Sequence, residues 1–184
     1  MGSMRTRLAA LARIAGALLG LLAVSHLTTW FRGLPTTYTM TGPSMAPSVG
    51  VNDWFLARPA APRLQRGTMV LMRFRDEGED HRVLRRVAGL PGDTLTMLGG
   101  KLAVNGEVAG WPFRVLEPRA DRTLDGPVPG TIYSWGPVVV GDDSVFVLSD
   151  LRDMAGWPDS RFLGPIPRGL IEDEYVALLW RASQ

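Results

Sequence analysis

With 184 residues, of which 46% are hydrophobic and 21% charged, the chain has the composition of a folded protein and enough length for one domain with a sizeable core. The sequence contains no cysteine and two histidines, which excludes disulfides, thiolate metal sites, a cysteine nucleophile and a histidine-based metal centre. The net charge is +2 without a long basic run, so we predict neither a nucleic-acid partner nor a cofactor.

The beginning of the chain predicts a membrane anchor. Residues 1–7 are short and basic, and residues 8–31 are mostly apolar, with Arg13 near one end and Trp30 and Phe31 at the other. An arginine near the end of a span can extend its side chain to the headgroups, and aromatic residues favour the membrane interface. We therefore predict that residues 8–31 cross the inner (cytoplasmic) membrane once.

The charges before this segment predict its orientation. Arg5 and Arg7 favour a cytoplasmic N-terminus, which would place residues 32–184 in the periplasm or its equivalent. Two alternatives stay open. A cleaved signal peptide would have its small-residue site at Ala23–Ser25, and a soluble protein would bury the same segment as a helix.

From Thr36 onward, short extended segments alternate with Gly, Pro and Asp turns, which predicts an all-β domain. The segment MLGGKLAVNGEV predicts hairpins with tight turns at Gly99-Gly100 and Asn105-Gly106. The expected strands are residues 53–57, 68–74, 82–89, 93–98, 101–106, 137–140 and 144–149.

Two later stretches lack this pattern. Residues 110–133 contain several prolines and little periodicity, and we predict a loop-rich insertion over the core. The end of the chain, LIEDEYVALLW, predicts a last strand or a short helix. Within it, Tyr175 to Trp180 is apolar enough to be expected in the core.

The segment LRRVAGLPGD, from Leu84 to Asp93, carries two adjacent arginines on a predicted strand. Adjacent residues of a strand point to opposite faces of the sheet. We therefore expect one of the pair, Arg85 or Arg86, to point inward.

The segment TMTGPSMAPSV surrounds Ser44 with Gly42, Pro43 and Pro47. These residues restrict the backbone to a turn that can expose a serine hydroxyl. A serine between prolines is usually a turn residue and no more, so this segment alone does not indicate a nucleophile.

Three further segments follow in order: RGTMVLMRF, LRRVAGLPGD and LSDLRDMAGWPDSRFLGPI. With the PSMAP turn before them, they resemble the bacterial type I signal peptidases. The resemblance covers the predicted anchor and most of the β domain and leaves residues 110–133 unmatched. It implies one N-terminal transmembrane helix followed by a mainly β, coiled antiparallel domain with serine endopeptidase chemistry.

The resemblance also implies roles for individual residues. Ser44 takes the nucleophile position, and its backbone N–H is the oxyanion donor, with Gly42 at the position of the usual side-chain helper. The segment Thr39 to Gly42 resembles the strand that pairs with the substrate backbone. The substrate groove falls on Tyr38, Met40, Thr41 and Leu84. Structural support falls on an Arg86–Asp150 ion pair and on a cluster of Arg152, Asp159 and Arg161.

The family's general base is an unprotonated lysine, and its position falls on Arg85. A buried lysine can lose its proton and accept one from serine, whereas guanidinium stays protonated and can only donate hydrogen bonds. A shift of one residue supplies Arg86, and the single lysine, Lys101, belongs to a predicted hairpin. His81 lies four residues before Arg85 on the strand, roughly 13 Å away, and we expect it on the surface.

Other departures from the family pattern accompany Arg85. Thr68 replaces the usual acidic residue, and SDLR at Ser149–Arg152 replaces the usual GDNR. We therefore predict a catalytically degenerate protein that serves as a binding or structural subunit of a membrane protein complex, with membrane or periplasmic partners. The alternative is an active type I signal peptidase that cleaves signal peptides from exported preproteins.

Overall fold

The computed structural model describes residues 13–25, 33–76, 78–153 and 158–183. The chain divides into two units, Met1–Leu34 and Pro35–Gln184, which we describe separately. In the first unit, residues 13–25 are helical. Within the described ranges, no helix combines the length and apolar character needed to cross a membrane. The rest of the predicted anchor and the basic N-terminus lie outside the described residues.

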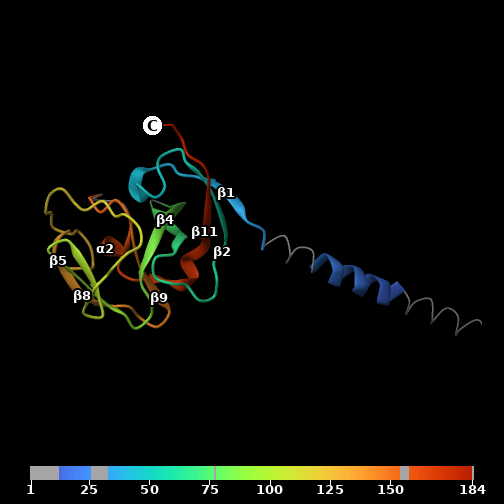
Figure 1. Ribbon diagram of the computed structural model, residues 1–184. Coiled ribbons are helices and arrows are strands. Elements are labelled where there is room, and N and C mark those ends of the chain that lie inside the picture. Colours follow the sequence, from blue (N-terminus) through green and yellow to red (C-terminus); the bar gives the residue numbers. More distant parts are fainter. Residues whose placement is uncertain (1–12, 26–32, 77, 154–157, 184) are drawn as a thin grey trace, which may run out of the picture. The chain divides into compact units, whose positions relative to one another are not determined.

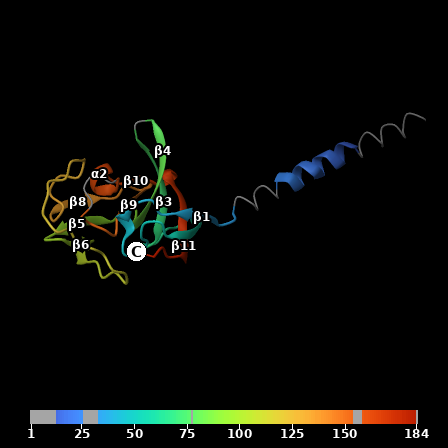
Figure 2. The same ribbon diagram turned by 90° about the horizontal axis from the view of Figure 1, so that it is seen from above.

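The second unit is built from two antiparallel sheets (Figure 1). In the larger sheet the strand order is β1-β2-β11-β3-β4-β9-β10, and in the smaller one it is β7-β6-β5-β8. Figure 2 shows β5 and β6 of the smaller sheet on one side of the unit and β1, β3 and β11 on the other. The larger sheet contains β1 (Thr36–Thr39), β2 (Trp54–Pro59), β3 (Met69–Asp76), β4 (Glu79–Gly89), β9 (Ser144–Leu148), β10 (Ile166–Pro167) and β11 (Ile171–Trp180). The smaller sheet contains β5 (Thr94–Leu98), β6 (Lys101–Val104), β7 (Glu107–Val108) and β8 (Trp135–Val139).

The predicted hairpin turns are confirmed. Gly99 and Gly100 join β5 to β6 with φ of 55° and 81°, and Asn105 and Gly106 join β6 to β7 with φ of 53° and 86°. Two successive positive φ angles match the right-handed twist of the flanking strands, and glycine and asparagine adopt them at least cost. These turns are determined by local sequence alone.

Both arginines of the predicted pair are buried, which corrects the expectation that only one would point inward. Arg85 is 1% exposed and Arg86 7%. The reason is that segments distant in sequence cover both faces at this end of β4: Ser44 and Pro158 contact Arg85, and Asp150 and Phe113 contact Arg86. At the far end of β4, His81 pairs with Phe74 and is exposed, as predicted.

The GLPGD segment connects the two sheets through Asp93. The Asp93 carboxylate accepts hydrogen bonds from the backbone N–H of Leu90, from the guanidinium of Arg66 and from the side-chain amide of Asn105. Just before it, a Cβ on Gly89 would lie 2.5 Å from the side chain of Leu95. The segment therefore has a structural task, which is to hold β4, β5 and the β6–β7 turn together.

The predicted insertion contains no strand, and several of its residues are themselves part of the core. Residues 110–133 form only isolated bridges, including Leu116 with Leu151 and Thr123 with Thr131. Its apolar residues Leu124, Val128 and Ile132 are buried in the cluster that contains Trp135 and Phe146. The segment therefore supplies part of the core beside the smaller sheet.

The end of the chain is strand β11, which confirms one of the two predicted forms, but its last part is not buried. Val176, Leu179 and Trp180 are 44%, 53% and 56% exposed. The pairing of β11 with β2 is irregular between Tyr175 and Ala177 and between Leu178 and Trp180, so the strand loses a regular inward face there. The prediction that Tyr175 to Trp180 belongs to the core therefore holds only for Tyr175 and Leu178, which are half-buried against the cluster that contains Phe55.

Candidate active site

Ser44 is held by a short helical turn. It is the middle residue of the 3₁₀ helix η1 (Pro43–Met45) and is 1% exposed. Met45 beside it is fully buried, and the Ser44 carbonyl accepts a hydrogen bond of 2.9 Å from the backbone N–H of Leu151. The serine backbone is thus anchored both to the core and to the loop after β9.

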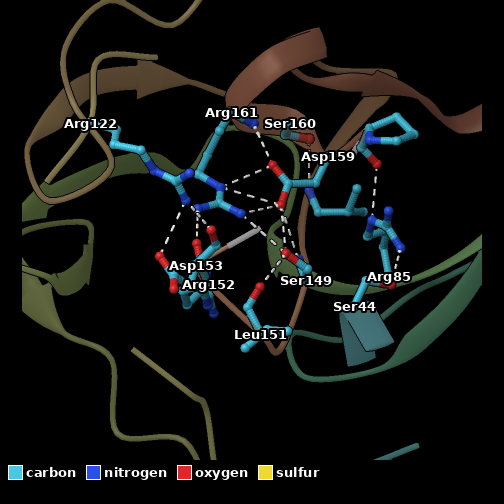
Figure 3. A network of polar contacts seen from close by, with 12 residues as sticks. Ser44, Arg85, Arg122, Ser149, Leu151, Arg152, Asp153, Asp159, Ser160 and Arg161 are labelled. Atoms are coloured by element: carbon cyan, nitrogen blue, oxygen red, sulfur yellow. Dashed lines mark hydrogen bonds and ion pairs between the residues drawn. The ribbon is translucent and has the colours of Figure 1, made fainter. Parts of the chain in front are cut away.

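Arg85 reaches Ser44 from β4. Its Nη1 donates to Ser44 Oγ at 2.9 Å and to the carbonyl of Leu84, and its Nε donates to the carbonyl of Pro158 at 2.9 Å (Figure 3). Among the described residues, its Nη2 is buried without a hydrogen-bond partner and no carboxylate forms an ion pair with the guanidinium. The side chain is a fixed cation beside the serine hydroxyl.

The protonation of Arg85 follows from these surroundings. Burial lowers its pKa from the ordinary arginine value to about 10; the carboxylate of Asp159 opposes this shift and the charge of Arg161 adds to it. A group with a pKa of about 10 is almost entirely protonated at neutral pH. Arg85 therefore donates to Ser44 Oγ and has no lone pair with which to remove the serine proton.

A second arginine, Arg161, is neutralised by Asp159. Asp159 caps α2 (Ser160–Leu163) by accepting from the backbone N–H of Arg161 at 3.0 Å, and it accepts from Arg161 Nη2 at 2.8 Å. Burial alone would raise the pKa of Asp159, but the charge and hydrogen bonds of Arg161, together with the charge of Arg85, hold it below its ordinary value. Figure 3 shows the Asp159 carboxylate directed toward Arg161 and away from Arg85.

Arg86 points to the other side of β4 and forms an ion pair with Asp150. Its Nε and Nη2 donate to the two carboxylate oxygens of Asp150, and its Nη1 donates to the carbonyl of Gly67 at 2.7 Å. Ser48 donates to the same carboxylate and accepts from Arg86 Nη2. The ring of Phe113 covers the guanidinium, with 3.7 Å between its centroid and Arg86 Cζ.

Arg152 is the other buried arginine without a carboxylate. Its Nε and Nη1 have no partner among the described residues, and its pKa is lowered to about 10, mainly by burial and then by the charge of Arg161. Its carbonyl accepts from Arg161 Nη1 at 2.7 Å. Around the site, four buried arginines therefore face two buried aspartates: Arg85, Arg86, Arg152 and Arg161 against Asp150 and Asp159.

The residues predicted to line a substrate groove do line one cavity together with Ser44 and Arg85. It holds about 70 Å³ of open space, and its walls include Tyr38, Met40, Thr41, Gly42 and Leu84. At its rim the hydroxyl of Tyr38 donates to Asp173 at 2.6 Å. Burial and this carboxylate raise the pKa of Tyr38 to about 12, so the phenol keeps its proton.

The segment predicted to pair with a substrate, Thr39 to Gly42, continues from β1. Strand β1 pairs with β2 and ends at Thr39, the first residue of that segment. Met40 is held by hydrogen bonds with Asp53 and Asn52. Gly42 is extended, with φ of −135° and ψ of 167°, and leads directly into the helical turn at Ser44.

Sequence reasoning missed several polar residues that hold the site together. Ser48 bridges Arg86 and Asp150, Ser149 donates to Asp159 at 3.0 Å, and Ser160 accepts from the backbone N–H of Val147 at 2.9 Å. The order Asp-Ser-Arg at 159–161 was a usable signal, because an aspartate before a short helix is a typical N-cap. No local pattern marks Ser48 or Ser149, whose partners are distant in sequence.

Comparisons with known proteins identify the family. The model of the family described as signal peptidase, peptidase S26, matches residues 10–180. Among curated proteins, the chain is 28% identical to signal peptidase I of Leptolyngbya laminosa over 77% of this chain and 66% of that protein. It is 29% identical to signal peptidase I of Bacillus amyloliquefaciens over 62% of this chain and 60% of that protein.

A probable signal peptidase I-2 of Synechocystis is 29% identical over 74% of this chain and 59% of its own length. The chain thus spans between 59% and 66% of the length of these three relatives. The crystal structure of a signal peptidase I from Enterococcus faecalis aligns with a TM-score of 0.43 and 20% identity, covering 61% of this chain and 96% of that one. The family match over most of its length places this chain in the signal peptidase, peptidase S26, family.

Proposed function

We propose that this protein recognises signal-peptide segments of preproteins through the groove beside Ser44 but does not hydrolyse them at an appreciable rate. The observation that carries the proposal is the hydrogen bond from Arg85 Nη1 to Ser44 Oγ, 2.9 Å long. It occupies the place where a serine peptidase of this family needs a group that accepts the serine proton. Family membership supports the recognition of a preprotein, and Arg85 supports the loss of cleavage.

The expected loss of rate follows from the chemistry of acyl transfer. A serine hydroxyl attacks a peptide carbonyl only as its proton leaves, so it needs a base within hydrogen-bond reach. Removing a general base costs on the order of 10² to 10⁴ in rate, and more when the nucleophile and base act as one unit. Protonated Arg85 can stabilise negative charge near Ser44 Oγ but cannot perform this step.

The binding of a peptide in the groove does not require a general base. The groove walls come from the strands β1 to β4 and from η1, which are anchored by backbone hydrogen bonds and buried apolar residues. Its small volume suits small side chains of an extended peptide. A protein that keeps these walls while losing the proton acceptor would hold its ligand instead of cutting it.

The same proposal includes a membrane location. We propose that residues 8–31 anchor the chain once, with the N-terminus in the cytoplasm and the β domain on the periplasmic side, where preproteins emerge. The apolar composition of this segment and the arginines before it support the orientation. A non-cleaving member would then act as a binding or structural subunit beside other membrane proteins.

A second candidate function is that of an active signal peptidase. The curated relatives carry that name, and burial lowers the pKa of Arg85 to about 10, so a small fraction of the guanidinium is neutral. In this case the neutral fraction, and with it the rate, would rise about tenfold per pH unit up to pH 10.

One experiment separates the two candidates. The full-length protein in detergent is assayed with a preprotein, beside Ser44→Ala, Arg85→Lys and the double variant. We expect no more cleavage by the unmodified protein than by Ser44→Ala, and cleavage by Arg85→Lys that disappears in the double variant. Cleavage by the unmodified protein that requires Ser44 and increases toward pH 10 would overturn the proposal and establish the second candidate.

A further inference from the structure

The buried charges around Ser44 do not balance within the described residues. Arg86 is paired with Asp150 and Arg161 with Asp159, but Arg85 has no carboxylate and its Nη2 has no partner. The four residues preceding Pro158 that lie outside the description, at 154–157, are Met-Ala-Gly-Trp and carry no side-chain carboxylate. A buried cation without an anion is costly, and proteins usually satisfy such a group with a ligand or an ion pair.

The missing anion has a defined place. Arg85 lines the same cavity as Ser44 and the groove residues, so a ligand lying along the groove meets the guanidinium where the serine hydroxyl is. The Nε side of Arg85 is occupied by the carbonyl of Pro158. Nη1, which donates to Ser44 Oγ, is therefore the donor that an anion in the groove would meet, in place of the serine hydroxyl.

The shape and polarity of the groove select the kind of anion. Its walls include the apolar side chains of Met40 and Leu84, and its volume of about 70 Å³ leaves little room for a long acidic side chain. The other arginine of the lining, Arg82, is paired with Glu172. A peptide that ends at this point brings a carboxylate attached directly to its backbone. Carboxylate also matches guanidinium because both are planar and can form paired, charge-assisted hydrogen bonds.

We infer that Arg85 makes this groove a receptor for the C-terminal carboxylate of an extended peptide that ends in a small residue. The inference rests on the proposed peptide-binding function and names its ligand class. Such an end is what hydrolysis of a peptide bond after a small residue produces, so the reaction that supplies the ligand is the cleavage of a preprotein by a competent peptidase. The protein would then retain a released signal peptide and need no catalytic step of its own.

The destabilising effect of Arg85 on the folded state agrees with a role in binding a ligand. A methionine would fill similar space next to Met40 and Leu84 without desolvating a charge. Groups that reduce stability in a cavity are typical of binding and catalytic sites. Arg152 has the same lack of a partner, but it lies outside this groove.

The test uses the full-length protein in detergent and two fluorescent apolar peptides that end in alanine, one with a free carboxylate and one with a C-terminal amide. We expect the free acid to bind about 10- to 100-fold more tightly, the range for a hydrogen bond between charged groups. Arg85→Gln should remove this preference. Ser44→Ala should keep it, because no covalent step is involved.

Arg75→Gln is the matched control, because it removes one positive charge from an exposed site on β3. Near-ultraviolet circular dichroism of each variant shows that the fold persists. Equal binding of acid and amide would overturn the carboxylate receptor and leave peptide binding intact. Tight binding of an amidated peptide with an internal aspartate would overturn the assignment to the chain end. Failure of both alanine peptides to bind would overturn the proposed function itself.

Discussion

The Arg85 guanidinium has five N–H donors, and the groups around it accept only part of them. Among the described residues, Arg85 donates to Ser44, Leu84 and Pro158, and each acceptor is a neutral oxygen. The charge itself is balanced only at a distance by Asp159, whose carboxylate is already engaged by Arg161. Arg85 therefore lowers the stability of the folded state.

This cost predicts that Arg85→Met stabilises the protein. We expect its free energy of unfolding to rise by roughly 1 to 3 kcal/mol near neutral pH, because an unsatisfied buried donor and an unpaired charge are removed. The pKa of Arg85 is lower in the folded state (about 10) than in the unfolded chain, so the folded state binds this proton less tightly. The destabilisation is therefore complete below pH 10 and declines as the pH rises above it, and the gain from methionine should decline with it.

Urea unfolding of both proteins at neutral pH and above pH 10 measures this difference, with Arg75→Met as the control for losing an exposed charge. Subtracting the two curves cancels other titrating groups, including Tyr38, whose raised pKa acts in the opposite direction in this range. A loss of stability in Arg85→Met, or a gain that stays constant with pH, would show that Arg85 has a partner that compensates its charge.

The chemical properties of the site residues could be predicted from the sequence. The arginine at position 85 is visible without a structure, and so is the inability of a protonated guanidinium to accept a proton. What sequence could not supply is the surroundings of that residue. The contact with Pro158 joins positions that are 73 residues apart, and no local pattern encodes it.

At the scale of elements, β4 is the strand on which the site depends. It directs Arg85 toward Ser44 and Arg86 toward Asp150. Its pairing with β3 and β9 fixes the register and thus the face to which each side chain points. Because side chains alternate along a strand, a slip of one residue would exchange the two arginines. The Arg86–Asp150 pair and the GLPGD turn both oppose such a slip.

We therefore predict that Asp150→Asn destabilises the protein by about 3 kcal/mol or more, because it leaves the Arg86 charge buried without compensation. Asp150 is fully buried and accepts from both Arg86 and Ser48. The measurement is the midpoint and slope of urea unfolding. Asp142→Asn is the matched control, since Asp142 is exposed and the same chemical change should leave the midpoint nearly unchanged. Similar losses in the two variants would argue against the ion pair as the source of register stability.

At the scale of the whole β unit, residues 110–133 act as a third component beside the two sheets. Figure 1 shows the loops of this region on the side of the unit that carries β5, β8 and α2. The buried residues Leu124, Val128 and Ile132 join it to the smaller sheet, and Gly126 packs against the backbone of α2. The segment links the core of the smaller sheet to the helix that positions Asp159 and Arg161.

This packing predicts an effect of Gly126→Ala. A Cβ at position 126 would lie 2.7 Å from the carbonyl oxygen of Phe162 and 2.8 Å from its Cα, so the backbone must move. We expect a loss of roughly 1 to 3 kcal/mol in the free energy of unfolding, the usual cost of overpacking. Gly110→Ala, where an added Cβ meets nothing within 4 Å, should change stability little. Equal effects of the two substitutions in urea unfolding would show that the segment does not pack firmly against α2.

Local patterns in the sequence were enough to predict an all-β domain and the turns at residues 99–100 and 105–106, and they show an arginine at position 85. These properties depend on residue type and on neighbours in the chain. Three other properties came from tertiary contacts: the burial of both Arg85 and Arg86, the pairing of Arg86 but not Arg85 with a carboxylate of the described residues, and the exposure of Val176, Leu179 and Trp180 in β11. These outcomes depend on which distant segments cover each face of a strand, and burial is a property of that arrangement and not of any single stretch of sequence.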